Sequence, residues 1–248
     1  MPCQPHKETQ VYIWLNFTQF CLLCDEPSDT SLAICVACEA ELPWLGDHCL
    51  CCALPLTGSG YGAGECCAQC DQRPPAFSQV ITAWTYEFVV DRLITRFKHR
   101  QQWPLGKLLA ELQGQYLQHR FDEGLPRPDA LLPVPLARQR LRQRGFNQSA
   151  MLANWLGEQL QLPVQARQLL RTRDTPSQQG LSAKARKQNL QGAFSLTDSH
   201  WVQGKHLALV DDVLTTGTTA HSLAQLLTGA GARRVDVYCL ARTPAPED

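Results

Sequence analysis

The sequence has no apolar run that approaches the roughly 20 residues needed by a bilayer-spanning helix, so we expect no membrane insertion. Its first ten residues are polar and show no signal-peptide pattern, which favours a cytoplasmic protein over a secreted one. Low-complexity tracts are absent, and nothing repeats outside a cysteine-rich segment near the start. With 44% hydrophobic residues, the chain has the composition of an ordinary globular protein.

The chain has a net charge of zero, but it contains an acidic segment and a basic segment whose charges cancel. Residues 1–71 hold nine acidic residues and one lysine, a net charge of −8. Residues 127–187 hold eleven basic and three acidic residues, a net charge of +8, which suits a phosphate ligand or a nucleic acid. A solvated surface without a ligand is the alternative interpretation. Within the basic block only Phe146 and Trp155 are aromatic, so we expect weak stacking of nucleic-acid bases.

Cysteine is concentrated at the start of the chain, where eleven of the twelve lie within the first 70 residues. Eight of them form four C-x-x-C pairs, which in a chain without a secretion signal indicates metal binding; redox disulfides are the competing interpretation. Eight thiolates suffice for two tetrahedral structural zinc ions, and the pattern resembles a double zinc ribbon. Sequential pairing is the simplest and crossed pairing stays open; the sequential sets are Cys21, Cys24, Cys35 and Cys38, then Cys49, Cys52, Cys67 and Cys70. Cys51 and Cys66 are spare thiols beside these positions.

The remainder of the chain has the pattern of an α/β domain. Apolar runs predict strands at 80–86, 130–135, 206–213 and 235–240. Helical periodicity predicts helices at 91–99, 105–117 and 148–160, and a further helix after residue 217. Because strands and helices alternate, we expect a mostly parallel sheet flanked by helices. We therefore predict an extension at 1–20, a double zinc ribbon at 21–75 that ends in a proline linker, and the α/β domain at 76–248.

One segment, Leu207–Thr219, combines a buried strand with a phosphate-binding pattern. The apolar run ends in Asp211 and Asp212, and a hydroxyl-rich loop around Gly217 leads into a helix. Helix N-termini present unpaired N–H groups to anions, and glycine lets the backbone approach a ligand closely. Adjacent carboxylates at a strand end are costly to bury without a ligand or a partner. A ligand-free capped helix is the alternative.

This segment resembles the 5-phosphoribosyl-1-pyrophosphate (PRPP) motif of type I phosphoribosyltransferases. The resemblance implies that Asp211 and Asp212 face the ribose hydroxyls of PRPP, which binds with Mg²⁺. It assigns the 5′-phosphate to the loop residues Thr215, Thr216, Gly217, Thr218 and Thr219. In the same enzymes the loop after an earlier strand receives the pyrophosphate; its counterparts here are Pro133, Val134 and Pro135.

A second resemblance covers residues 21 to 243, nearly the whole chain. The cysteine pairs, the motif Arg144-Gly-Phe-Asn-Gln148 and the acidic–threonine motif together resemble the ComF family. The motif follows a run of arginines whose forked donors suit pyrophosphate: Arg138, Arg140, Arg142 and Arg144. A third matching segment starts at Arg171 and runs to Phe194, in the loop that closes over PRPP in the enzymes. Within it, Arg186 is the candidate for a pyrophosphate contact.

The resemblance implies a role in natural competence, that is, in DNA uptake and the handling of incoming single-stranded DNA. A competence helicase-like protein is then an expected partner. The sequence shows no separate hood for a nucleobase, because the zinc segment occupies that place. Two hypotheses follow: a protein that binds PRPP or DNA phosphates in an accessory role, or an active phosphoribosyltransferase with an unidentified acceptor. Lys98 and His99 are interpreted only as charges that complement a helix end.

Overall fold

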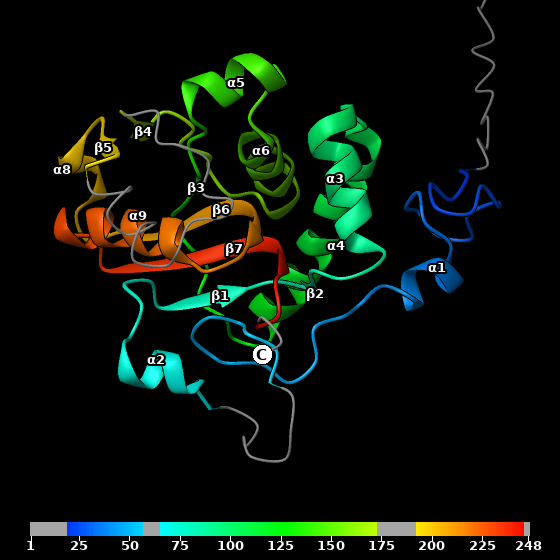
Figure 1. The fold of residues 1–248 in the computed structure, drawn as a ribbon, viewed down its shortest axis with the longest axis horizontal. Coiled ribbons are helices and arrows are strands. Elements are labelled where there is room, and N and C mark those ends of the chain that lie inside the picture. The colour runs from blue at the N-terminus through cyan, green and yellow to red at the C-terminus, as the bar shows by residue number, and fades with distance from the viewer. Residues whose placement is uncertain (1–18, 57–64, 173–191, 246–248) are drawn as a thin grey trace, which may run out of the picture. The chain divides into compact units, whose positions relative to one another are not determined.

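The computed structural model describes residues 19–56, 65–172 and 192–245, and it contains two compact units, Met1–Ala40 and Glu41–Asp248 (Figure 1). Residues 19–40, the described part of the first unit, include the short helix α1 (Val36–Ala40) and one fully buried aliphatic side chain, Ile34. Hydroxyl groups order its turns, since Ser28 Oγ and Thr30 Oγ1 both donate to the Ile34 carbonyl, at 2.9 Å each. So small an apolar core contributes little folding free energy, which is typical of modules that a bound metal stabilises.

The second unit is built on a five-stranded parallel sheet. Strand β7 (Arg234–Arg242) lies between β6 (His206–Leu214) and β1 (Gln79–Ile81), and β3 (Ala130–Pro133) pairs with the far side of β6. Strand β2 (Trp84–Thr85) also pairs with β7, and every pairing in this sheet is parallel. The predicted mostly parallel sheet is confirmed.

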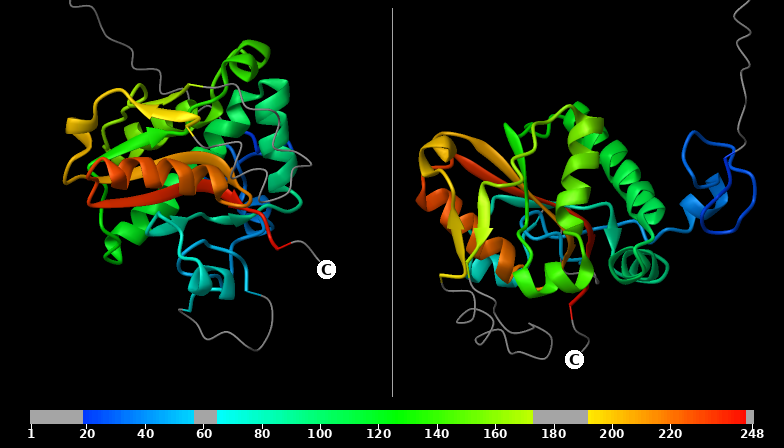
Figure 2. Two further views of the ribbon diagram at one scale, coloured as in Figure 1. Left: turned by 60° about the vertical axis from the view of Figure 1, so that its left-hand side comes forward. Right: turned by 90° about the horizontal axis from the view of Figure 1, so that it is seen from above.

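Helices cover both faces of the sheet, as a parallel sheet requires (Figure 2). Helix α9 (Thr218–Gly229) packs its apolar stripe, including Leu223 and Leu227, on the face formed by Leu207, Leu209 and Val237. Helices α4 (Trp103–Asp122) and α6 (Gln148–Leu160) lie on the opposite face, where Phe121 of α4 contacts Tyr238 of β7. The remaining elements are α2 (Ala68–Gln72), α3 (Val90–Arg100), α5 (Arg138–Arg144), β4 (Leu169–Arg171), β5 (Phe194–Leu196) and α8 (Ser199–Val202).

The predicted strand at 80–86 is interrupted at its centre. The Ala83 N–H donates to Oε1 of the buried Gln113 on α4 at 3.0 Å, and Thr82 Oγ1 donates to the Leu240 carbonyl at 2.8 Å. At Thr82 and Ala83, hydrogen bonds to or from side chains replace the backbone hydrogen bonds of a continuous strand. Two short strands, β1 and β2, therefore form instead of one. The Ala83 carbonyl accepts from the Leu45 N–H. This bond joins the sheet to the chain just before the second cysteine segment, which runs from Cys49 to Cys70.

Among the residues that the structure describes, no helix is both long enough and apolar enough to cross a membrane.

Candidate functional site

The site forms where β3 and β6 part at the carboxyl edge of the sheet. Pro133 pairs with Val210, and the Val134 N–H donates to the Val210 carbonyl at 2.9 Å. Beyond this point β3 has ended, and the two residues that follow Val210 on β6 are Asp211 and Asp212. Sites in parallel sheets form at this edge. The structure thus brings the predicted pyrophosphate loop beside the predicted ribose-facing acids.

The residues that follow α5 fix the positions of both the loop after β3 and Asp211 on β6. Asn147 caps α6, because its Oδ1 accepts from the Ser149 N–H at 3.0 Å, and its Nδ2 donates to the Val134 carbonyl at 3.1 Å. Ser149 Oγ donates to Asp211 Oδ1 at 2.9 Å. The N-terminus of α6 therefore bonds both the loop after β3 and the first acidic residue of β6. Phe146 packs against Phe97 and Trp103, as a largely structural aromatic residue would.

Lys98, at the end of α3, supplies the partner that the acidic pair needs. Its Nζ lies 2.7 Å from Oδ2 of Asp212, whose side chain is 6% exposed. Burial lowers the pKa of Lys98 to about 8, although the negative charge of Asp211 acts to raise it. Burial raises the pKa of Asp211 to about 6, against the opposing effects of Lys98 and the Ser149 hydroxyl. The site thus holds ionisable groups that burial pushes toward neutrality.

Further cations surround this ion pair. Arg144 and Arg140 both act to lower the pKa of Lys98. Burial, and then the neighbouring Arg140, lowers the pKa of Arg144, which donates to Gln148 Oε1 at 2.6 Å. The pKa of His99 is lowered by burial and by Arg144 and Lys98. A multivalent anion would relieve the repulsion among these cations.

The loop after β6 presents open backbone donors. Gly217 has φ of 69°, the left-handed region that glycine adopts at little cost, and it precedes α9 with no side-chain cap. Thr215 and Thr216 are exposed, and the Thr216 and Thr218 hydroxyl oxygens lie 2.8 Å apart. The N-terminus of this 12-residue helix is therefore shaped to accept a phosphate.

A cavity of about 840 Å³ adjoins this loop. One wall is Thr216–Thr218 and the outward face of α9, including His221; the other wall comes from the second cysteine segment and the linker, including Arg73 and Phe77. Phe194 of β5 closes one end. Apolar walls with a few polar groups are typical of small-molecule sites.

The eight predicted zinc ligands come together in the sequential pairing. Cys21, Cys24, Cys35 and Cys38 form one cluster, and Cys49, Cys52, Cys67 and Cys70 the other, with their sulfur atoms within 4.8 Å of one another. The Cys24–Cys35 and Cys52–Cys67 sulfur distances are 3.7 and 3.8 Å. A tetrahedron with Zn–S bonds of ~2.3 Å has edges of about 3.8 Å, so both tetrads fit zinc.

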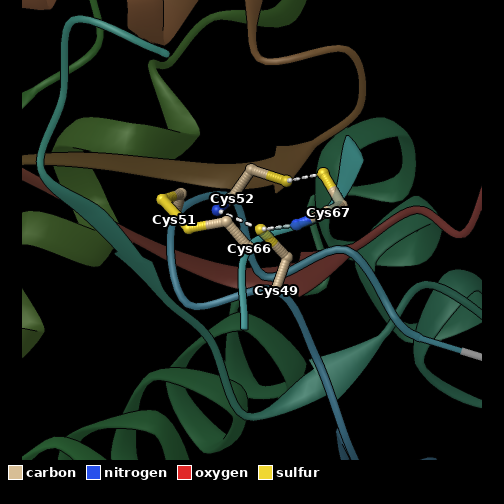
Figure 3. Close-up of a disulfide and its surroundings, with 5 residues drawn as sticks. All are labelled: Cys49, Cys51, Cys52, Cys66 and Cys67. Carbon is tan, nitrogen blue, oxygen red and sulfur yellow. Dashed lines mark hydrogen bonds between the residues drawn. A yellow bond between two sulfur atoms is a disulfide. The ribbon is translucent and has the colours of Figure 1, made fainter. Parts of the chain in front are cut away.

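Backbone N–H groups support the second tetrad (Figure 3). The N–H groups of Cys67 and Cys52 donate to Cys49 Sγ at 3.1 and 3.5 Å, as suits a thiolate ligand. Cys51 and Cys66, the spare thiols, are joined by a disulfide bond beside it. The eight cysteines of the tetrads are free thiols, which favours metal binding over the competing disulfide interpretation of the C-x-x-C pairs.

The predicted arginines divide into two groups. Arg138 and Arg142 are exposed on α5, whereas Arg140 and Arg144 act electrostatically on the buried Lys98. Arg186 lies outside the described residues, and its predicted contact with pyrophosphate stays a prediction.

Sequence reasoning missed the roles of Lys98 and Ser149. Lys98 follows Ile94 by four residues and therefore continues the buried stripe of α3, a signal that could have been read from the spacing. Ser149 had no comparable signal, because its partner Asp211 lies 62 residues away in the chain.

Fold and site together define a phosphoribosyltransferase domain, and a model of the phosphoribosyl transferase domain family matches residues 147–248. DNA utilization protein YhgH of Escherichia coli strain K12 is 37% identical over 231 residues, 92% of this chain and 99% of that protein. Competence protein F of Haemophilus influenzae is 34% identical over 216 residues, 86% of each chain. The chain belongs to the ComF family, which these two proteins represent. Competence protein ComFC of Bacillus subtilis is 25% identical over 243 residues, 90% of this chain and 95% of that protein.

Solved structures give weaker likenesses. Glutamine PRPP amidotransferase of B. subtilis, complexed with ADP and GMP, has a TM-score of 0.36 and 24% identity, covering 54% of this chain and 25% of that one. Hypoxanthine phosphoribosyltransferase of Staphylococcus aureus has a TM-score of 0.37 and 15% identity, covering 55% and 64%. Both TM-scores are low, so neither likeness bears on ligand or mechanism.

Proposed function

We propose that this protein binds PRPP with Mg²⁺ at the carboxyl edge of its sheet. The 5′-phosphate lies on the loop Thr215–Thr219, the ribose hydroxyls face the Asp211–Asp212 pair, and the pyrophosphate lies between the loop after β3 and Arg144. Magnesium, when bound with PRPP, neutralises part of the pyrophosphate charge. The carboxylate oxygens here are the ligand type that Mg²⁺ prefers.

The observation that carries this proposal is the gathering of cations around the acidic pair. Arg140 and Arg144 both act to lower the pKa of Lys98, whose ammonium group is paired with Asp212, and Arg140 acts in the same way on Arg144. A polyphosphate ester brings negative charge to these cations, and its ribose uses the remaining acceptor capacity of the carboxylates.

Phosphate binding is tested by calorimetry with PRPP and Mg²⁺ on Gly217→Ala. An added Cβ would lie 3.8 Å from the Phe77 ring, an ordinary van der Waals contact, so the change alters the backbone conformation of the phosphate loop without a clash, and we expect affinity to fall at least tenfold. Gly204→Ala is the matched control, since Gly204 has φ of 70° against 69° for Gly217 and has nothing within 4 Å of an added Cβ. Both variants carry the same backbone strain, so equal PRPP affinity in the two would contradict the proposed phosphate position.

PRPP affinity should depend on pH in a bell-shaped manner. Asp211 must ionise to accept from ribose, so affinity rises as pH increases through about 6, the pKa of its carboxyl group. Lys98 must stay protonated to face the anion, so affinity falls as pH increases through about 8. The phosphates of PRPP titrate near pH 6 as well. Calorimetry on Asp211→Asn separates the two effects: the variant should lose part of the acid limb, and its alkaline limb should move to lower pH because the charge that raises the pKa of Lys98 is gone, whereas an unaltered profile would refute the assignment.

For the biological role, we propose DNA utilization, as the names of the relatives YhgH and competence protein F describe it for those proteins. Helix α5 exposes Arg138 and Arg142, which suits the phosphates of single-stranded DNA. Trp103, half exposed, contacts Phe146 close to the end of α5 and offers a stacking face that the sequence alone did not reveal. A competence helicase-like partner and a cytoplasmic location accompany this role as expectations from the family.

DNA binding is tested by anisotropy with a labelled single-stranded oligonucleotide across a salt series. Replacing Arg138 and Arg142 by alanine should reduce the slope of log affinity against log salt by about 1.4, because each neutralised phosphate adds ~0.7 to that slope. Trp103→Ala should weaken binding without altering the slope, because stacking releases no counterions. Binding that is insensitive to salt, or equal in wild type and the double variant, would exclude α5 as the DNA surface.

The second candidate is an active phosphoribosyltransferase, and the cavity of about 840 Å³ favours it. The cavity opens onto Thr216–Thr218 of the phosphate loop, so an acceptor held there would lie close to a bound phosphoribosyl group. The discriminating assay is release of pyrophosphate from PRPP and Mg²⁺ in the presence of candidate acceptors. PRPP binding without release supports the accessory role.

A further inference from the structure

Arg242, the last residue of β7, joins the phosphate loop to the second cysteine tetrad. Its Nη1 donates to the carbonyls of Leu214 and Thr215, at 3.2 and 2.5 Å, where the loop leaves β6, and to the Thr243 carbonyl at 2.6 Å. Its Nε donates to the carbonyl of Cys52 at 2.9 Å. The residue is 7% exposed, so these charge-assisted bonds form in a place where little water competes for them.

Leu214, the residue at which the phosphate loop begins, is bonded both by Arg242 and by Thr243. Leu214 pairs with Arg242 in the sheet register, and the Leu214 carbonyl also accepts from Thr243 N–H and Thr243 Oγ1, at 3.1 and 3.0 Å. The first residues of the phosphate loop therefore take their position from the end of β7. Arg242 also bonds a residue outside the sheet, since it donates to the Cys52 carbonyl.

At its other end, Arg242 holds a backbone group of a metal-ligand residue. Cys52 belongs to the second tetrad, and its Sγ lies 3.8 Å from that of Cys67. The neighbouring Ala53 is fully buried in the same apolar cluster as Phe77 and Leu214. A metal ion in the tetrad fixes the position of the Cys52 carbonyl, and loss of the metal frees it to move.

We propose that Arg242 is a positioning residue through which metal binding at the second tetrad sets the affinity of the phosphate loop for its ligand. This inference rests on the proposed phosphate site. With zinc bound, the Cys52 carbonyl holds the guanidinium in the orientation that fixes the Leu214 and Thr215 carbonyls. Without zinc, the guanidinium loses one of its anchors, and phosphate binding must then order the loop at a cost in entropy. The first tetrad has no part in this coupling.

The experiment compares the full-length protein with Cys52→Ser and with the matched control Cys24→Ser, which removes the same ligand type from the first tetrad. Each variant should lose one zinc by metal analysis. Calorimetry with PRPP and Mg²⁺ should show affinity about tenfold lower for Cys52→Ser, within the usual range of coupling between two sites, and unchanged for Cys24→Ser. Equal losses in both variants, or none in either, would overturn the proposal.

Arg242→Lys tests the connecting residue with the tetrads intact. Lysine keeps the charge but lacks the fork that spans both anchors, so we expect two zinc ions per chain and PRPP affinity reduced about tenfold. In the Arg242→Lys background, Cys52→Ser should cause no further loss, because the two changes break one connection. Independent, additive losses would show that zinc acts through another route and would reject Arg242 as the link.

Amide hydrogen exchange gives a readout that needs no ligand. The Thr243 amide, which donates to Leu214, and the peptide covering the phosphate loop should exchange faster in Cys52→Ser and Arg242→Lys than in Cys24→Ser. If wild-type protein binds no PRPP at all, the proposed function fails while this comparison still decides the coupling. Unchanged exchange in Cys52→Ser, with one zinc lost, would refute the coupling itself.

Discussion

Purified protein should contain two zinc ions per chain, and Cys67→Ser should contain one. Eight free thiols form two tetrads with the sulfur spacing of a zinc site, and structural zinc contributes on the order of 10 kcal/mol to the folding of such small modules. The loss of one thiolate ligand should therefore unfold the module around it. Inductively coupled plasma mass spectrometry gives the zinc content, and circular dichroism and limited proteolysis report the local unfolding.

The two tetrads should respond differently because they belong to different compact units. Cys24→Ser should expose residues 21–40 to protease while the sheet keeps its thermal transition. Cys67→Ser should also lower the melting temperature of the sheet, since its tetrad lies within the larger unit. The control is the double change Cys51→Ser and Cys66→Ser, which removes the disulfide pair and should keep both zinc ions. A wild-type content well below one zinc per chain would contradict the assignment of these cysteines as metal ligands.

The second large effect concerns the ion pair of Lys98 and Asp212. Asp212→Asn leaves the partly buried Lys98 ammonium group without its ion-pair partner, and removing one member of a buried pair typically costs 3–5 kcal/mol. We expect about 3 kcal/mol, at the lower end of that range, because Lys98 has a pKa of about 8 and can release its proton. Urea unfolding with an unchanged m-value measures the loss.

The double variant Lys98→Met with Asp212→Asn separates stability from binding. Replacing both charges by neutral groups of similar size should restore most of the stability, since no unpaired charge stays buried. PRPP binding should stay weak in the double variant, because both a cation and an acidic group of the site are gone. Full recovery of PRPP affinity would show that the pair serves the fold alone. A double variant as unstable as Asp212→Asn would show that the destabilisation has another cause.

This ion pair also changes how the acidic motif is understood. From the sequence, two adjacent carboxylates at a strand end required a ligand or a partner. The structure provides a partner in Lys98, so the motif by itself does not prove a ligand. The argument for PRPP now depends on Arg144, which lies near the pair, and on the start of α9, which has no side-chain cap.

Features that depend on neighbouring residues could be read from the sequence. C-x-x-C spacing fixes which sulfur atoms share a turn, and the spacing of apolar residues gave α6 at Gln148–Leu160 as predicted. The strand, acidic pair and threonine loop of β6 and α9 follow each other directly in the chain. Their local geometry therefore carries the signal, and the same motifs placed the chain in its family.

Contacts between distant segments were decided only by the tertiary structure. Arg242 meets Cys52 across 190 residues, and no local pattern marks either residue as a partner of the other. The second tetrad lies in the same compact unit as the sheet, although the cysteine spacing alone grouped it with the first tetrad. Lys98 meets Asp212 because α3 packs beside the carboxyl edge of the sheet. Spacing determines what a segment can form by itself, whereas burial and pairing depend on which surfaces the fold brings together.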